Sequence, residues 1–290
     1  MRIVTLPEEL RAACEDVRRS GRKVGFVPTM GALHEGHLSL VRAAKAHAPF
    51  VVASIFVNPT QFGPKEDFSR YPRDLEGDGT KLASAGCDLL FAPETASMYP
   101  EGERTRVRVE HLTETLCGPF RPGHFDGVAT IVTKLFAIVG EAHCVFGKKD
   151  YQQLAVLRRL AKDLLLPVTL HGHPIVRELD GLAMSSRNAY LDARERARAL
   201  CLVKGLRAAC KQFGEGQRDP SALERAARGE VEREASSIDY VSVVDPDALH
   251  AFAGPIPAPG RALLAIACRV GMTRLIDNVV LGEDPIESLR

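Results

Sequence analysis

The stretch Val24-Gly25-Phe26-Val27-Pro28-Thr29-Met30-Gly31-Ala32-Leu33-His34-Glu35-Gly36-His37 passes from a short apolar run into a helical pattern. The run 24–27 is typical of a buried strand, and the helix is expected to begin near Gly36. Two histidines therefore flank a glycine at a helix N-terminus, where unpaired N–H groups and the helix dipole favour an anion. Imidazole donors and a glycine that lets a ligand approach closely suit a phosphate.

Other interpretations of so short a motif remain open. Two partly exposed histidines in a loop before a helix would give the same pattern. A zinc site is less favoured, because His34 and His37 are three residues apart instead of four and no third ligand cluster lies nearby in the sequence.

The chain on either side of this stretch alternates between strands and helices. Further strands are expected at 50–57, 89–91, 144–146 and 168–170, and further helices from near Asp74, Asp126 and Lys149. Near-continuous apolar strands alternating with helices predict a Rossmann-like α/β fold, with a parallel sheet covered by helices on both faces. This domain is assigned to residues 1–175.

The pattern changes after about Ile175. A long helix is expected over 192–213 and a charged helix over 221–235. Three strand-like runs follow at 238–244, 263–270 and 274–281. Residues 176–290 are therefore predicted to form a smaller C-terminal α+β domain.

Composition limits the classes of function. The 290 residues are 45% hydrophobic and 26% charged, with a net charge of +1, which gives no argument for nucleic acid or an anionic membrane as partner. The seven cysteines are scattered and lack C-x-x-C spacing, as expected of reduced thiols in a cytoplasmic protein. The N-terminus does not resemble a signal peptide, and the uncharged run 46–64 contains prolines that argue against a membrane helix.

Polar residues follow three of the expected strands. Asn58 and Gln61 follow one strand, and Gly147 to Asp150 follow another, as the histidine loop follows the first. Ligands of parallel sheets bind beyond the carboxyl ends of the strands, so these segments are expected to converge there. The alternatives are ordinary turn residues at 58–61 and a capped, solvated helix start at 147–153.

A fourth segment, Met184-Ser185-Ser186-Arg187-Asn188, offers two hydroxyls and a guanidinium, a combination that suits phosphate. Such a run is also common in loops. Together with Tyr71-Pro72-Arg73 and the run 120–128, these four segments, in this order and spacing, resemble the pantoate–β-alanine ligase family of the His-x-Gly-His nucleotidyltransferase superfamily. The resemblance extends from about Val24 to Leu191.

The resemblance implies an ATP-dependent, AMP-forming ligase of pantothenate biosynthesis, on the route to coenzyme A. Pantoate and ATP would give a pantoyl adenylate and pyrophosphate, and β-alanine would then give pantothenate and AMP. It also implies Mg²⁺ as a cofactor, a cytoplasmic location and a homodimer.

The resemblance also assigns roles to residues. Those expected to act in catalysis are His34, His37, Lys149 and Arg187. Those expected to bind ATP are Met30, Gly31, Ala32, Leu33, His34, Glu35, Gly36, His37, Gly147, Lys148, Lys149, Asp150, Val176, Met184, Ser185, Ser186 and Arg187. Pantoate is expected to contact Gln61, Gln153 and Asn58, and Asp78 matches a magnesium-side position less closely.

The chain departs from the family pattern at Lys148, Asp74 and Gly77, which affects the magnesium contacts more than the reaction. Two alternatives remain at this stage. One is another nucleotidyltransferase of the superfamily, which would need basic residues for a phosphorylated acceptor. The other is a non-catalytic nucleotide-binding protein on the same fold.

Overall fold

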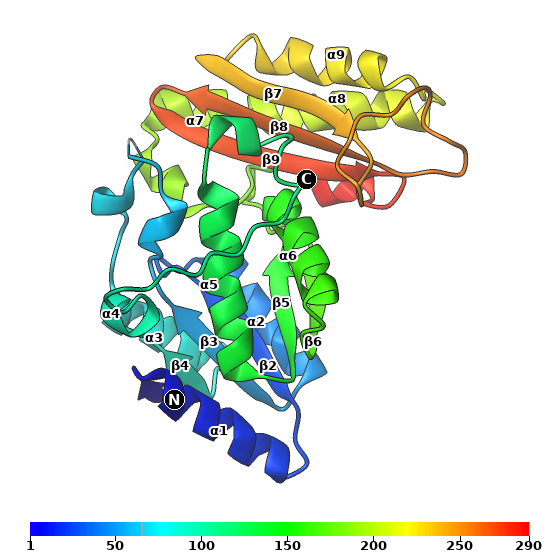
Figure 1. The fold of residues 1–290 in the computed structure, drawn as a ribbon. Coiled ribbons are helices and arrows are strands. Elements are labelled where there is room, and N and C mark those ends of the chain that lie inside the picture. Colours follow the sequence, from blue (N-terminus) through cyan, green and yellow to red (C-terminus); the bar gives the residue numbers. More distant parts are fainter. Residues whose placement is uncertain (65, 290) are drawn as a thin grey trace. The chain divides into compact units, whose positions relative to one another are not determined.

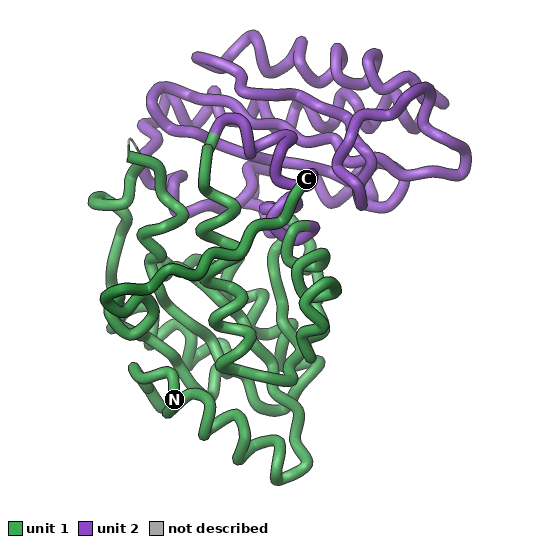
Figure 2. Tube along the Cα trace, in the orientation of Figure 1, with its two compact units in different colours: residues 1–110, 121–148, 156–174 green, residues 111–120, 149–155, 175–290 purple. Residues whose placement is uncertain are grey.

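The computed structural model describes residues 1–64 and 66–289. The chain divides into two compact units, coloured separately in Figure 2. Unit 1 comprises residues 1–110, 121–148 and 156–174, and unit 2 comprises residues 111–120, 149–155 and 175–290. Unit 2 thus includes two short segments from within the range 1–175 that the sequence assigns to the first domain.

Unit 1 contains a six-stranded sheet in which all neighbouring strands are parallel, in the order β1-β4-β3-β2-β5-β6 (Figure 1). The strands are β1 (Arg2–Val4), β2 (Val24–Thr29), β3 (Phe50–Ile55), β4 (Leu89–Phe91), β5 (Ala142–Gly147) and β6 (Val168–His173). The predicted parallel sheet is confirmed. All five expected strands are present, although β3 ends at Ile55 instead of Val57.

The helices of unit 1 pack in pairs, α1 against α5 and α2 against α3. Their bounds are α1 (Pro7–Arg19), α2 (Glu35–His47), α3 (Leu75–Ser84), α4 (Thr95–Met98) and α5 (His124–Val139); α6 (Tyr151–Asp163) begins in unit 2 and continues in unit 1. The sequence analysis missed β1 and α1. The buried face of α1 is Leu10, Cys14 and Val17, a helical spacing that was available in the sequence.

Unit 2 contains a three-stranded antiparallel sheet, β7 (Ser237–Val244), β8 (Ala262–Val270) and β9 (Thr273–Leu281). Its helices are α7 (Ala193–Ala199), α8 (Cys201–Gly214) and α9 (Pro220–Val231). The α+β pattern is confirmed, but the single long helix expected over 192–213 is wrong: α7 ends before Leu200 and α8 begins after it. Leu200 keeps helix-like angles of φ −63° and ψ −11°. The side chains of α7 and α8 therefore follow nearly the same helical spacing, and the hydrophobic pattern of the sequence does not show the break.

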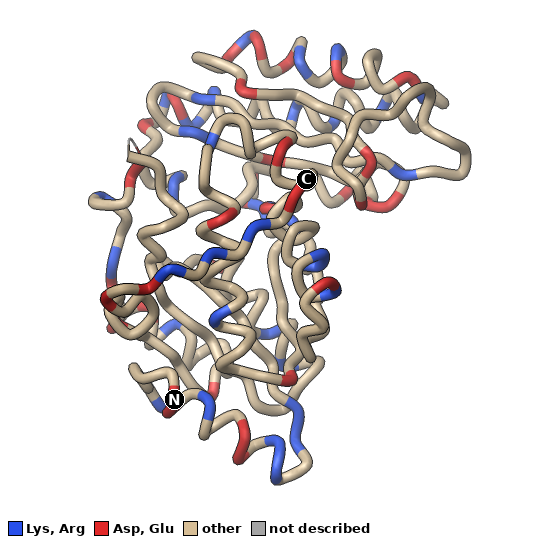
Figure 3. The backbone as a smooth tube through the Cα atoms, in the orientation of Figure 1, with Lys and Arg blue, Asp and Glu red and all other residues tan. Residues whose placement is uncertain are grey.

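The remaining expectations concern charge, cysteines and membranes. Basic and acidic residues are interspersed along both units in Figure 3. Six of the seven cysteines are buried and all are free thiols. In the part of the chain that the structure describes, every helix is too short or too polar to span a bilayer.

Candidate functional site

The histidine loop leaves the sheet of unit 1 at the point where the strand order reverses. From β2 the chain proceeds to β3 and β4 on one side, whereas β5 and β6 lie on the other. Such a switch point is the usual ligand site of an open parallel sheet. Because β3, β2 and β5 are neighbouring parallel strands, the segments that follow Ile55, Thr29 and Gly147 start at the same edge of the sheet. This convergence was predicted from the sequence.

The backbone of the loop turns sharply after β2. Gly31 has φ +84° and Ala32 has φ +52°, both in the left-handed region. A Cβ on Gly31 would lie 3.1 Å from Ile55 Cγ2 and 3.2 Å from Asp78 Oδ2, so a side chain there would be strained and crowded. The Thr29 hydroxyl accepts from the Gly31 N–H (3.2 Å) and donates to the Ser54 carbonyl (2.8 Å), which ties the turn to β3.

The two histidines lie side by side where α2 begins. Their ring centroids are 4.2 Å apart, and the His37 N–H donates to the His34 carbonyl at 2.8 Å. His37 Nδ1 is 3.5 Å from the His34 N–H, an orientation that favours the tautomer with its proton on Nε2. An N–H donor at a helix N-terminus suits the charge that develops on a phosphate during nucleotidyl transfer.

Two side chains of α3 hold both backbone polar groups of Leu33. Asp78 Oδ1 accepts from the Leu33 N–H at 2.9 Å, and Lys81 Nζ donates to the Leu33 carbonyl at 3.0 Å. The Asp78 carboxylate is 1% exposed and lies 3.3 Å from Lys81 Nζ. Its second oxygen, Oδ2, has no hydrogen-bond partner within the described ranges 1–64 and 66–289. The helix therefore fixes the residue that precedes His34.

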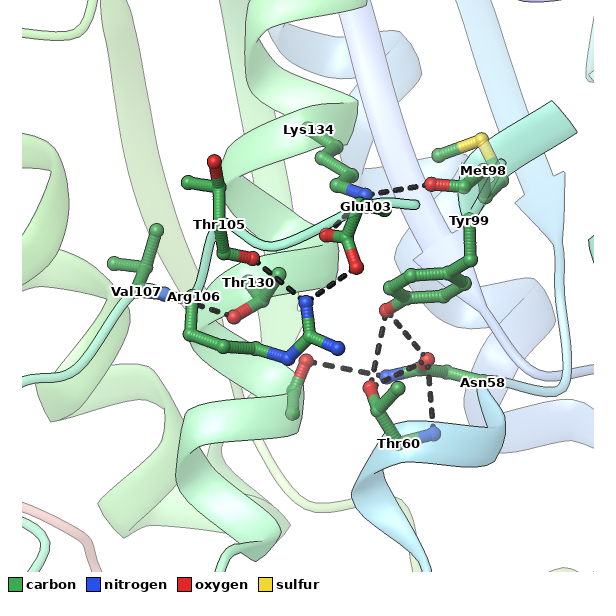
Figure 4. A network of polar contacts seen from close by, with 11 residues as sticks. Asn58, Thr60, Met98, Tyr99, Glu103, Thr105, Arg106, Val107, Thr130 and Lys134 are labelled. Carbon is green, nitrogen blue, oxygen red and sulfur yellow. Dashed lines mark hydrogen bonds and ion pairs between the residues drawn. The ribbon is translucent and has the colours of Figure 1, made fainter. Parts of the chain in front are cut away.

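The turn after β3 carries Asn58 and Gln61, which differ in what their side chains contact. Asn58 is 1% exposed, and Nδ2 donates to Gln61 Oε1 and to the Gly127 carbonyl, both at 3.1 Å. Its Oδ1 accepts from the hydroxyls of Tyr99 (2.7 Å) and Thr60 (2.9 Å) (Figure 4). All the bonds that an amide can form are thus made within the protein, and Asn58 orients Gln61.

The Gln61 side chain is less completely bonded. Its Nε2 donates to Met30 Sδ at 2.7 Å, and a thioether is a weak acceptor. A hydroxyl or carboxylate of a ligand would be a stronger partner for the same N–H groups. Gln61 therefore remains a candidate for binding pantoate, and it connects the turn after β3 to the histidine loop.

The run 121–128 fixes the main chain of Gln61. His124 Nδ1 lies 2.8 Å from the Gln61 carbonyl, and Arg121 lies 2.9 Å from His124 Nε2 and forms an ion pair of 2.6 Å with Glu66. Burial alone would raise the pKa of Glu66, but the hydrogen bond and charge of Arg121 lower it below its ordinary value. Arg121 and His124 therefore connect the run to the turn that carries Gln61.

In unit 2, Gln152 and Gln153 have different environments. Gln152 is buried: Oε1 accepts from the Cys117 N–H at 2.9 Å, and Nε2 donates to the carbonyls of Leu112 (2.9 Å) and Thr115 (2.8 Å). Gln153 is partly exposed, and none of these bonds involves it. Gln152 therefore has a structural role, and Gln153 stays the candidate for pantoate.

The segments at 176 and 184–187 are neighbours within unit 2. The Met184 N–H donates to the Val176 carbonyl at 3.0 Å, and the Ser185 hydroxyl accepts from the Arg187 N–H at 3.3 Å. A buried ion pair between Arg177 and Asp277, 2.7 Å long, anchors this hairpin to β9. Sequence reasoning did not identify Arg177, because no local pattern shows that its partner lies 100 residues away.

Lys148, Lys149 and Asp150 form a 3₁₀ turn that leads directly into α6, so the helix expected to start near Lys149 is present and begins at Tyr151. Neighbouring side chains diverge by about 120° in such a turn. Lys148 is half-buried and belongs to unit 1, whereas Lys149 belongs to unit 2 and its carbonyl accepts from Asn278 Nδ2 at 2.8 Å.

Residues 2–280 match the family model described as pantoate-beta-alanine ligase. The chain belongs to this family. It is 50% identical over 286 residues to a pantothenate synthetase of Geobacter sulfurreducens, covering 98% of this chain and 100% of that protein. A pantothenate synthetase of a Thermoanaerobacter species is 51% identical over 277 residues, with 95% and 97% covered.

Solved structures of the family have the same fold. The pantothenate synthetase of Thermus thermophilus superposes with a TM-score of 0.89 at 48% identity and covers 96% of this chain and 99% of its own. The pantoate-beta-alanine ligase of Francisella tularensis, complexed with β,γ-ATP and β-alanine, gives a TM-score of 0.77 at 31% identity, with 99% of each chain covered.

The site residues predicted from the sequence thus form two groups. Unit 1 brings together the histidine loop, Asn58, Gln61 and Asp78, and unit 2 brings together Val176 and the segment 184–187. The sequence analysis missed the residues that support the first group, Lys81, Tyr99 and Glu66. For Lys81 a local signal was available, because an acidic and a basic residue three apart on one helix, as at 78 and 81, can form an ion pair.

Proposed function

We propose that this chain joins pantoate to β-alanine at the expense of ATP, with AMP and pyrophosphate as the other products. The end-to-end family match carries the proposal. The His-x-Gly-His loop at the switch point of the sheet and Gln61 beside it supply the matching chemistry.

The reaction has two steps. A carboxylate oxygen of pantoate attacks the α-phosphorus of ATP in line with the departing pyrophosphate, which leaves a pantoyl adenylate. The amine of β-alanine then attacks the carbonyl of this anhydride and loses a proton as AMP departs. Both steps need positioning and charge stabilisation more than a covalent intermediate on the protein.

Each side chain has a distinct role in the proposal. His34 and His37 donate to the ATP phosphates, and the Nε2 proton favoured for His37 suits the developing charge. Gln61 and Gln153 bind the hydroxyl and carboxylate groups of pantoate. Lys149 and Arg187 bear positive charge for the phosphates, with Gly147, Asp150, Val176 and Met184 to Ser186 as further nucleotide contacts.

Magnesium would accompany ATP and neutralise charge on its phosphates. Asp78 fits a direct ligand poorly, because one oxygen accepts from Leu33 and the carboxylate is 1% exposed. A magnesium ion usually keeps several water ligands, which suits an exposed carboxylate better than this buried one. The geometry favours Asp78 as the residue that holds the histidine loop.

The products of the reaction test the proposal. With pantoate, β-alanine and ATP, we expect AMP and pyrophosphate in equal amounts. With pantoate and ATP but no β-alanine, we expect exchange of labelled pyrophosphate into ATP. Stoichiometric ADP, or exchange that does not require pantoate, would contradict it. The proposed homodimer is a separate matter, tested by sedimentation equilibrium.

A further inference from the structure

A second group of histidines lies at the opposite end of α2. Among the described residues, His47, His143 and His171 place one ring nitrogen each within 4.8 Å of one another. His47 is the last residue of α2, His143 is the second residue of β5 and His171 lies in β6. All three belong to unit 1, which brings them together from three separate elements.

The geometry of this histidine cluster is close to that of a metal site. His143 Nδ1 and His171 Nε2 are 3.1 Å apart. Two imidazoles that bind one tetrahedral Zn²⁺ at about 2.0–2.1 Å have nitrogens about 3.3 Å apart. The His47 ring stacks on His171 with centroids 3.7 Å apart, so it must turn to direct a nitrogen at the same ion. His47 is exposed at the helix end, which leaves room for that turn.

Two further features suit a cation. The C-terminal end of a helix carries partial negative charge, and His47 is in the last turn of α2. β6 is an edge strand of the sheet. His47 is exposed, so water can reach the cluster and complete the coordination shell of an ion bound by the three histidines.

We propose that His47, His143 and His171 form a binding site for a divalent transition-metal ion of the zinc class, separate from the phosphate end of α2. Three histidines and one water are a known tetrahedral ligand set for Zn²⁺. His47 lies ten residues beyond His37, about 15 Å along the helix. The proposed metal site therefore shares no residue with the proposed ligase site.

Zinc binding by the full, untagged chain tests the site, since a polyhistidine tag would itself bind the metal. Equilibrium dialysis of the wild-type chain should give one Zn²⁺ per chain. His143→Ala and His171→Ala should each weaken binding at least 100-fold, beyond the roughly 10–100-fold cost of losing an outer-shell partner. His47→Ala should do the same, and its exposed position makes misfolding least expected in this variant.

Two control variants identify the source of binding. His111→Ala removes a histidine that is 89% exposed in unit 2 and should bind zinc as the wild type does. His37→Ala should also retain binding, and a loss in that variant would overturn the proposal. Loss of zinc binding in His143→Ala and His171→Ala but not in His47→Ala would overturn the site of three histidine ligands. Wild-type levels of binding in all three cluster variants would do so as well.

Cobalt provides a readout that does not depend on activity. Four-coordinate Co²⁺ absorbs strongly in the visible region, whereas the hydrated ion absorbs weakly. We expect the strong band with the wild-type chain and its loss in His47→Ala. A weak band in the wild-type chain at saturating Co²⁺ would contradict a tetrahedral site.

Discussion

The two ends of α2 carry histidines in opposite electrostatic settings. At the first turn, His34 and His37 lie where the dipole is positive and where the loop from β2 leaves the switch point of the sheet. At the last turn, His47 meets His143 and His171 where the dipole is negative. In the two proposals, the same side chain donates a hydrogen bond to an anion at one end and a lone pair to a cation at the other.

The two ends also differ in how they are supported. The loop before His34 is held by bonds from Thr29, Asp78 and Lys81. The histidine cluster is held by ring stacking and one hydrogen bond between imidazoles. Pre-organised donors matter most where charge develops during a reaction, whereas a metal ion can itself order its ligands. Substitutions should therefore separate the two ends cleanly.

The largest effect is expected for His37→Ala. The change removes a donor aimed at the phosphates and should slow pyrophosphate exchange about 100-fold, roughly 3 kcal/mol of transition-state stabilisation. His34→Ala should behave similarly. His171→Ala is the matched control and should exchange at the wild-type rate. An equal fall in the rate of pyrophosphate exchange in His37→Ala and His171→Ala would show that the two ends of α2 are coupled.

A smaller effect is expected for Gln61→Ala, beside the phosphate end. Loss of the amide leaves polar groups of pantoate without partners, at about 1–3 kcal/mol. The KM for pantoate should therefore rise by roughly tenfold or more while the KM for ATP changes little. Asn58→Ala should differ from Gln61→Ala by also lowering the melting temperature, since it breaks the hydrogen bonds to Gly127 and Tyr99. An equal rise in both KM values for Gln61→Ala would assign it a purely structural role.

Asp78 distinguishes support of the loop from binding of magnesium. Asp78→Ala removes the acceptor of the buried Leu33 N–H, which should cost about 1–3 kcal/mol of unfolding free energy. Asp78→Asn keeps an oxygen there and should recover part of that stability and of the exchange rate. The magnesium concentration for half-maximal exchange should be the same in Asp78→Asn and the wild type. A large increase in that concentration would instead favour Asp78 as a ligand of the ion.

The smallest effect concerns acid stability near the phosphate end. Arg121 holds the pKa of Glu66 below its ordinary value of 4.5. The resulting stability is present above pH 4.5, where the unfolded chain is also ionised, and is lost as pH falls through the lower folded value. Glu66→Gln should therefore reduce the fall in melting temperature below pH 4.5. The same fall in both proteins would mean that Glu66 makes no contribution.

The sequence by itself determined much of unit 1 and the sheet edge at which the histidine loop lies. Period-3.6 and continuous apolar patterns located β2, α2, β3 and β5, since buried strands and amphipathic helices differ in spacing. Parallel strands then place the histidine loop and Gln61 at one edge. One local detail was wrong, the unbroken helix over 192–213, because the break at Leu200 preserves hydrophobic spacing.

Only the tertiary structure decided what the individual polar groups do. Asn58 and Gln152 form strong hydrogen bonds with both ends of their amide groups within the protein, whereas the Gln61 N–H group donates to a thioether. Asp78 and Lys81 reach a loop 45 and 48 residues away, and the histidine cluster unites residues of one helix and two strands. Periodicity records which face of an element is buried. Hydrogen-bond and metal partners depend on distances in space that no local pattern encodes.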